Sequence, residues 1–130
     1  MTEFIYLTKD SVVEMQYDLI EKFGGEHGII NEGVVSYAVE APALVMYGTE
    51  RYLTISEKAA ILCYTLVTRH AFVDGNKRIG YVAMKVFLRL NDYDTSDNVD
   101  SGESMIIKIA SGRSSLAELK SWIDNSITKI

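Results

Sequence analysis

The sequence contains little cysteine and little proline, and each scarcity excludes a class of protein. Cys63 is the only cysteine among 130 residues, so the chain cannot form an internal disulfide, and a secreted disulfide-rich domain is not expected. One proline, nine glycines and 48% hydrophobic residues exclude collagen-like and disordered chains. Because no charged and then apolar leader opens the sequence, we expect a protein of the reducing cytoplasm.

The sequence also lacks a long hydrophobic run and an excess of positive charge. The longest uncharged stretch, Ala59–Thr68, holds ten residues, about half of the roughly 20 that a membrane-spanning helix needs. Eighteen acidic and 13 basic residues give a net charge of −5, which opposes non-specific binding to nucleic acid or anionic lipid. We therefore expect no membrane segment and no DNA binding, and any bound anion must be held by a local cluster of donors.

Apolar residues recur at helical spacing through most of the chain and predict a single all-α domain over residues 1–130. We expect a compact bundle of about six helices. The predicted helices are Lys9–Phe23, Asn31 to Pro42, Ser56 to His70, Asn76–Leu90, Glu103–Ala110 and Ser115–Ser126. The helix from Ser56 has few polar residues, so it should lie in the core. Strand should be limited to a small N-terminal element at Phe4–Leu7 and a flap or hairpin within 43–53.

The segment His70–Arg78, between the two most apolar helices, is crowded with ionisable side chains. The N–H groups at the start of the second helix should attract an anion, because they lack partners and lie at the positive end of the helix dipole. These groups belong to Gly75, Asn76, Lys77 and Arg78. Two of these residues add full positive charges, and the glycine permits close approach of the backbone, so phosphate is the expected ligand.

Three other residues of this segment complete a phosphoryl-transfer site. Asp74 could hold a Mg²⁺ ion that bridges phosphate oxygens, as a lone carboxylate commonly does. Histidine is a common general base near neutral pH, so His70 could accept a proton from an incoming hydroxyl group. Phe72 should point inward and fix the loop against the core. Each residue taken alone could instead be a helix cap, a turn residue or a solvated charge, but their density within nine positions favours a functional site.

The segment resembles the signature of the Fic/Doc superfamily, His-x-Phe-x-Asp/Glu-Gly-Asn-Gly-Arg-x-x-Arg. The matching residues are His70, Phe72, Asp74, Gly75, Asn76 and Arg78. Lys77 replaces the last glycine and Tyr81 replaces the second arginine, and both departures are typical of the Doc branch, the death-on-curing toxins of toxin–antitoxin pairs. Gly75 agrees with the Fic pattern, whereas some Doc proteins carry alanine there. Other Doc-like stretches are Leu19–Gly25, Gly28–Ala38, Phe87–Tyr93 and Ile109–Gly112.

This resemblance implies a compact helical fold and, for the Doc branch, transfer of the ATP γ-phosphate to a threonine of elongation factor Tu, which blocks translation. Fic relatives instead transfer AMP to a protein hydroxyl, and their second arginine orients the nucleotide. By resemblance, His70 is the base, Asp74 the Mg²⁺ ligand and Gly75 the point of close approach, while the phosphate cradle consists of Asn76, Lys77 and Arg78.

The resemblance also implies a partner, a cognate antitoxin whose disordered tail folds on an apolar groove of the toxin. Many Fic proteins are restrained by a helix that carries Ser/Thr-x-x-x-Glu-Gly/Asn. Ser114–Glu118 comes near this motif, but Leu119 follows the glutamate, so we interpret the stretch as the start of a helix.

Several other interpretations remain open. Asp92–Glu103 has oxygen-bearing residues at most positions of a calcium loop but Asp97 where glycine is required, and Asp100 with Glu103 better fits a helix capping box. A zinc site would have only His27, His70 and Cys63 as ligands, and Cys63 should be an inert core residue. A ribonuclease that uses His70 and Arg78 fits poorly with the acidic net charge. A nucleotide-binding module without turnover is a further alternative.

Overall fold

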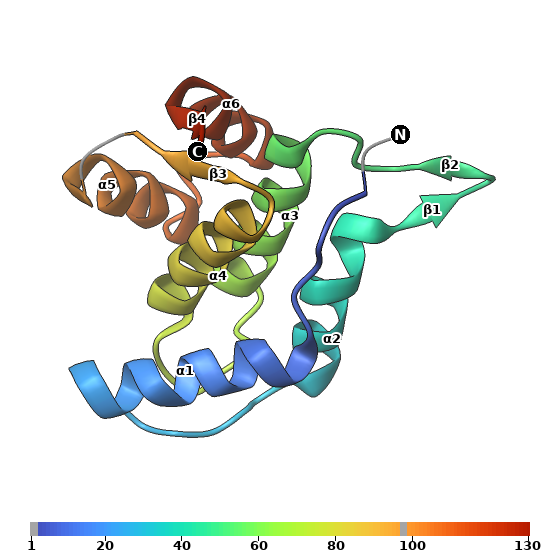
Figure 1. The fold of residues 1–130 in the computed structure, drawn as a ribbon. Coiled ribbons are helices and arrows are strands. Elements are labelled where there is room, and N and C mark those ends of the chain that lie inside the picture. The colour runs from blue at the N-terminus through green and yellow to red at the C-terminus, as the bar shows by residue number, and fades with distance from the viewer. Residues whose placement is uncertain (1–2, 97–98) are drawn as a thin grey trace.

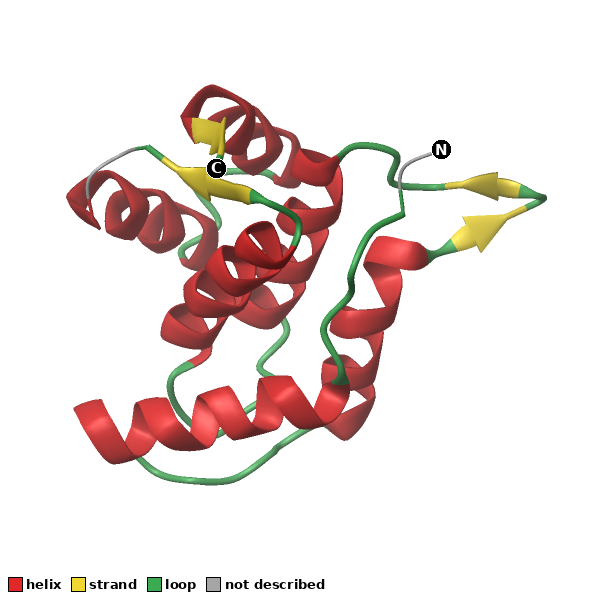
Figure 2. Cartoon of the chain, viewed as in Figure 1, coloured by secondary structure: helices red, strands yellow, loops and turns green. Residues whose placement is uncertain are grey.

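The computed structural model describes residues 3–96 and 99–130, which form a helical bundle with two small sheets (Figures 1 and 2). The helices are α1 Lys9–Phe23, α2 Glu32–Glu40, α3 Ile55–Thr68, α4 Asn76–Leu90, α5 Val99–Ala110 and α6 Leu116–Ser126, with a short 3-10 turn, η1, at Ala41–Ala43. The strands are β1 Val45–Met46, β2 Thr49–Glu50, β3 Tyr93–Thr95 and β4 Ile127–Lys129. The all-α prediction is confirmed. No helix in the described residues is long and apolar enough to cross a membrane.

Helix α3 lies in the core, as its apolar sequence predicts, and packs most extensively against α4. The two helices approach closely at Gly80, where an added Cβ would lie 3.2 Å from the carbonyl oxygen of Cys63. The surrounding core includes fully buried side chains from both helices, among them Leu66, Ile79 and Phe87. This packing fixes the two ends of the connection between α3 and α4.

Local capping signals explain most helix bounds. The Thr8 side chain accepts a hydrogen bond from the N–H of Ser11, and α1 spans the predicted residues. Asn31 caps α2 as expected, and α3 begins at Ile55 after a Thr54 cap. In α6, a capping box joins Ser115 and Glu118, which confirms that this stretch starts a helix.

The predicted start of α5 is wrong. The helix begins at Val99, not at Glu103. Asp100 and Glu103 therefore both lie within the helix, and the predicted capping box does not precede it.

The predicted flap is the antiparallel hairpin β1–β2, in which Val45 pairs with Glu50 and Met46 pairs with Thr49. Its turn is Tyr47–Gly48, and both residues have positive φ angles of 51° and 78°. Positive φ at both central residues is the geometry that matches the right-handed twist of the flanking strands.

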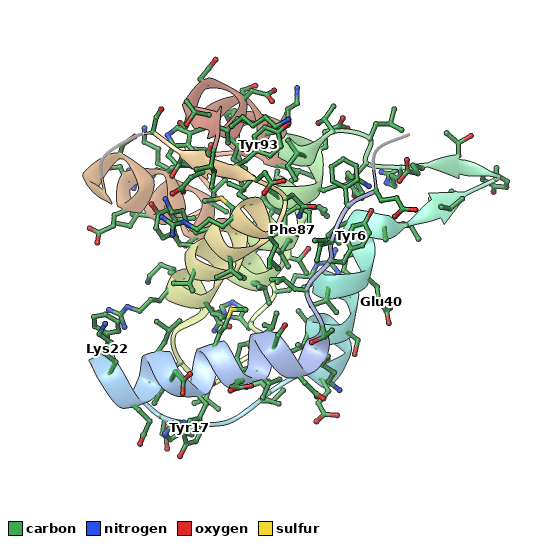
Figure 3. The ribbon with its side chains drawn as sticks, viewed as in Figure 1. Tyr6, Tyr17, Lys22, Glu40, Phe87 and Tyr93 are labelled. Atoms are coloured by element: carbon green, nitrogen blue, oxygen red, sulfur yellow. The ribbon has the colours of Figure 1, made fainter. Side chains whose placement is uncertain are left out.

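At most a small N-terminal strand was expected, and none forms there: residues 4–7 run as an extended segment outside any sheet. Tyr6 packs its ring on Phe87 of α4, with centroids 6.1 Å apart (Figure 3). Asn91 fixes the same segment by accepting from the N–H of Ile5 at 2.8 Å and donating to its carbonyl at 2.9 Å. Side-chain and aromatic contacts thus replace a strand ladder.

The sheet β3–β4 was not predicted. It joins the segment after α4 to the end of the described chain, with Asp94 opposite Thr128. Lys85 and Arg89 of α4 form ion pairs with Asp94 at 2.7 and 2.8 Å, and these contacts hold β3 against α4.

The ammonium group of Lys58 is buried near the N-terminal end of α3. Lys58 is 0% exposed and donates to the carbonyl of Pro42 at 2.7 Å and to Glu50 Oε1 at 3.2 Å. Its Nζ also lies 5.0 and 5.4 Å from the ring centroids of Phe4 and Tyr6. We call these five residues the Lys58 cluster. The cluster ties the N-terminal segment, η1 and the β1–β2 hairpin to α3.

Candidate functional site

The segment His70–Arg78, here called the motif loop, joins α3 to the start of α4 and reaches the level of α1 (Figure 1). Residues Gly24–Asn31, here called the entry segment, connect α1 to α2 and run beside the loop. Helix α1 and the entry segment therefore lie beside a loop that is distant from both of them in sequence.

Backbone hydrogen bonds fix the motif loop to the entry segment. The N–H of Ile30 donates to the carbonyl of Ala71 at 2.8 Å, and the N–H of Val73 donates to the carbonyl of Gly28 at 3.0 Å. Gly28 has a φ of +138°, and a Cβ there would lie 3.0 Å from Val73 Cγ2, so this close contact requires glycine. The backbone of the loop is thereby held before any ligand binds.

The entry segment is itself attached to α1. The rings of Tyr17 and His27 stack with centroids 4.2 Å apart, and His27 Nε2 lies 2.8 Å from Glu21 Oε2. Tyr17 lies on the side of α1 that faces away from α4 (Figure 3). These contacts pass around α1 and anchor the entry segment.

Phe72 is fully buried, which agrees with its predicted place against the core. The side chain of Asn76, a residue predicted to belong to the phosphate cradle, hydrogen-bonds the backbone of Phe72. Its Oδ1 accepts from the N–H of Phe72 at 3.0 Å, and its Nδ2 donates to the carbonyl of Phe72 at 2.9 Å. These two hydrogen bonds hold the Asn76 side chain across the loop, and its backbone N–H, in the first turn of α4, remains available to an anion.

His70 has an exposed side chain and a left-handed backbone, with a φ of 50°. This conformation is uncommon for a residue other than glycine and costs on the order of 1 kcal/mol. His70 lies two residues after the end of α3, and this backbone conformation leaves its imidazole at the surface, at the start of the motif loop. An exposed imidazole can exchange protons with a substrate, whereas a histidine packed in the core cannot.

Asp74 is exposed and is held from two sides. Its Oδ2 accepts a hydrogen bond from the N–H of Glu26 at 2.8 Å, and its backbone carbonyl accepts one from Gln16 Nε2 at 3.1 Å. No donor in the described part of the chain lies within hydrogen-bond distance of Oδ1. The carboxylate is thus oriented, and one of its oxygens is open to a ligand.

Helix α4 begins with donors available to an anion. Its N-cap, Gly75, is left-handed with a φ of 77°, and the N–H groups of Asn76, Lys77 and Arg78 have no acceptor within the helix because they lie in its first turn. The side chains of Lys77 and Arg78 are exposed. Arg78 places its guanidinium 4.4 Å from the ring centroid of Phe23, at the end of α1. This arrangement is suited to phosphate oxygens.

Tyr81, which stands where Fic proteins have the second arginine, packs between two helices. Tyr81 is half-buried, and an added Cβ on Gly102 would lie 2.6 Å from its hydroxyl oxygen. The tyrosine therefore fills the contact between α4 and α5, and it brings no positive charge to the motif loop.

The structure also shows the surroundings of the residues in the alternative sites, namely the Cys63 nucleophile, a metal cluster and the calcium loop. Cys63 is fully buried, and burial raises the pKa of its thiol to about 12, so it is no nucleophile. Across residues 3–96 and 99–130 there is no group of three or more metal-binding side chains of His, Cys, Asp and Glu. In the proposed calcium loop, Asp94 is engaged by two cations of α4 and Glu103 lies in α5, while Asp97 falls outside the described residues.

Sequence reasoning missed three residues that shape the site, namely Gln16, Glu26 and Phe23. Gln16 had a detectable signal, because it lies four residues from both Val12 and Ile20 and so interrupts an apolar stripe with an amide. The Glu26 contact uses a backbone N–H, and the Phe23 contact joins the ends of two helices. Neither of these has a signature in the sequence.

Comparison with known proteins agrees with this geometry. The model of the Fic/DOC family matches residues 6–88, and the chain belongs to that family. The chain is also similar to Toxin Doc of Mycolicibacterium smegmatis, with 36% identity over 90 residues that cover 68% of this chain and 69% of the relative. The region matched by the family model, residues 6–88, contains the whole motif loop.

Proposed function

We propose that this chain is a Doc-type toxin of a toxin–antitoxin pair that acts in the cytoplasm as a protein kinase. It would transfer the γ-phosphate of ATP to a threonine of elongation factor Tu and so block translation. The observation that carries the proposal is the motif loop, whose backbone is fixed while its imidazole, carboxylate, ammonium and guanidinium groups are exposed. Similarity to Toxin Doc supports the same assignment.

The donors of the loop are suited to Mg²⁺ and a triphosphate. Mg²⁺ commonly binds through one or two carboxylates together with water and substrate phosphate, and Asp74 offers one oriented carboxylate with an open oxygen. Asp74 would hold the ion, which when bound would neutralise charge on the phosphate oxygens. Lys77, Arg78 and the free N–H groups of α4 would bind the phosphate oxygens directly.

His70 is the group that would handle the proton. Its ring nitrogen would accept the proton of the threonine hydroxyl as the hydroxyl oxygen forms a bond to the γ-phosphorus. The bond between that phosphorus and the bridging oxygen would break, and ADP would leave. The exposed position of His70 allows a protein hydroxyl to reach it.

The alternative reaction is AMP transfer to a protein hydroxyl. In the Fic pattern, a second arginine orients the nucleotide for attack at the α-phosphate. Tyr81 occupies that position and packs against Gly102. This departure favours the kinase reaction over AMP transfer.

The proposal includes an antitoxin partner with a disordered tail that folds on the toxin. Apolar side chains that such a segment could cover are exposed on the β1–β2 hairpin, where Val45 is 57% exposed and Tyr47 is 100% exposed. A chain that folds on binding needs this kind of apolar surface to offset its loss of conformational entropy.

Radiolabelled ATP tests the proposed reaction. The full chain is incubated with Mg²⁺, elongation factor Tu and ATP labelled at either the γ- or the α-phosphate, with His70→Ala as the matched control. Label from the γ-phosphate on the target, absent with the variant, supports the kinase. Label from the α-phosphate means AMP transfer, and bound nucleotide without labelled target means a binding module.

A further inference from the structure

The hydrogen bonds around Asp74 reach it from two elements outside the motif. Gln16 of α1 donates to the Asp74 carbonyl at 3.1 Å, and the N–H of Glu26 donates to Asp74 Oδ2 at 2.8 Å. These partners are 58 and 48 residues distant in sequence. The position of this carboxylate therefore depends on the tertiary fold, and not on the motif alone.

Gln16 is the more informative of the two partners because it is nearly buried. It is 4% exposed and lies on the stripe of α1 that also buries Val12 and Ile20. A buried side-chain amide costs free energy unless it is hydrogen-bonded, and an apolar residue at this point would continue the stripe. The side-chain amide of Gln16 donates its hydrogen bond to the backbone carbonyl of Asp74. This contact indicates that Gln16 helps to position Asp74.

The entry segment holds the carboxylate itself. Gly25 has a φ of +117°, and an added Cβ would lie 3.3 Å from Asp74 Cβ and 3.4 Å from Asp74 Oδ2. The absence of a side chain at Gly25 therefore lets the next N–H, that of Glu26, reach Oδ2. With Oδ2 held, the direction of Oδ1 is set as well.

We propose that Gln16 is a positioning residue for the cation ligand Asp74 and that it acts together with the Gly25–Glu26 backbone. The proposal rests on the proposed function, since it assumes that Asp74 binds Mg²⁺ with nucleotide. Mg²⁺ requires nearly ideal octahedral geometry, so it tolerates little movement of its carboxylate ligand. Partners that orient a metal ligand are worth about 10- to 100-fold in metal affinity.

The test compares the affinity for a non-hydrolysable ATP analogue with and without Mg²⁺, measured by calorimetry on the full chain. Gln16→Met keeps the size of the side chain and removes the donor. We expect the Mg²⁺-dependent gain in affinity to fall by about 10-fold, with the metal-free affinity unchanged. Val12→Ala is the matched control, since it loosens the same stripe without touching Asp74 and should lower thermal stability but keep the full Mg²⁺ gain.

Gln16→Leu is the second variant, which keeps the test valid if the methionine variant does not fold, and it should show the same loss. Asp74→Asn reports on the metal site and should abolish the Mg²⁺ gain. If Gln16→Met or Gln16→Leu folds and keeps the full Mg²⁺ gain while Asp74→Asn loses it, the role of Gln16 is refuted and the proposed function stands. If the unmodified chain shows no Mg²⁺ gain, the proposed function fails as well.

Discussion

The Lys58 cluster and the motif loop both carry charged side chains and lie at opposite ends of α3. The charge of the cluster is buried, whereas the charges of the loop are exposed. Lys58 is 0% exposed, and its ammonium is surrounded by a carbonyl, a carboxylate and two aromatic rings. His70, Asp74, Lys77 and Arg78 are all exposed, although the backbone that carries them is hydrogen-bonded to the entry segment.

This difference is the one expected between a structural charge and the charges of a binding site. A buried charge is tolerated when protein groups satisfy it, and Lys58, which is closed off from solvent, is not accessible to a ligand. In the motif loop, backbone hydrogen bonds to the entry segment hold the chain in place, while the charged side chains of Lys77 and Arg78 are exposed to solvent. Substitutions should therefore reduce stability at the first region and chemistry at the second.

The largest expected effect is on the reaction at the motif loop. His70→Ala should lower the rate of phosphate transfer by roughly 10²- to 10⁴-fold, because it removes the proton acceptor. The melting temperature should stay close to that of the unmodified chain, since the side chain is exposed. Radiolabel transfer and thermal melting measured on the same preparation check both parts, and a variant that remains fully active would remove His70 from the mechanism.

The next effect is on stability at the Lys58 cluster. Lys58→Ala should destabilise the protein by about 2–4 kcal/mol, because it leaves a cavity and an unpartnered Pro42 carbonyl. Thermal or urea unfolding measures the loss. Lys120→Ala removes a lysine that is 39% exposed and should change the melting temperature far less. Equal losses in the two variants would contradict the structural role of Lys58.

A smaller effect is expected on nucleotide binding. Lys77→Ala and Arg78→Ala should each weaken the affinity for ATP by roughly 10-fold, because each removes a charge-assisted hydrogen bond to phosphate. Arg113→Ala serves as a control, since this exposed arginine hydrogen-bonds Ser111 and lies outside the motif loop. The account is wrong if the control weakens nucleotide binding as much as the loop variants do.

The smallest effect concerns pH and the contact between β3 and α4. Hydrogen bonds from Lys85, and then from Arg89, lower the pKa of Asp94 to about 2. Because the pKa is lower in the folded state, this stabilisation is complete above pH about 4 and is lost as the pH falls toward 2. It amounts to about 1 kcal/mol for a pair near the surface. Unfolding curves of Asp94→Asn should show a weaker pH dependence in this range, and identical slopes would contradict the assignment.

The parts of the fold that follow from local signals could be predicted from the sequence. Thr8 and Gly24 bound α1, and the glycine before Asn76 starts α4, so both helices span the predicted residues. The sheet β3–β4 could not be predicted, because it pairs Tyr93 with Lys129 and no local sequence pattern indicates a pairing between residues so far apart in the chain. The burial of Lys58 was also unexpected, since lysine is mostly exposed and only its tertiary partners explain this exception.

The candidate site divides in the same way. The motif loop was evident from the density of its side chains, but the place of each residue depends on contacts made elsewhere. Asn76 was expected in the phosphate cradle, but the sequence did not indicate that its side chain also hydrogen-bonds the backbone of Phe72. Gln16 supports Asp74 from 58 residues away, and only its interruption of an apolar stripe marked it in the sequence.

In the proposed function, a triphosphate and Mg²⁺ bind at the motif loop and at no other charged region. Amide NMR spectra of the isotope-labelled full chain, titrated with a non-hydrolysable ATP analogue and Mg²⁺, test it most directly. We expect the largest shifts at the amides of residues 74–78 and small shifts at Lys58 and its neighbours. Unchanged motif-loop amides in a folded protein, or larger shifts at the Lys58 cluster, would contradict it.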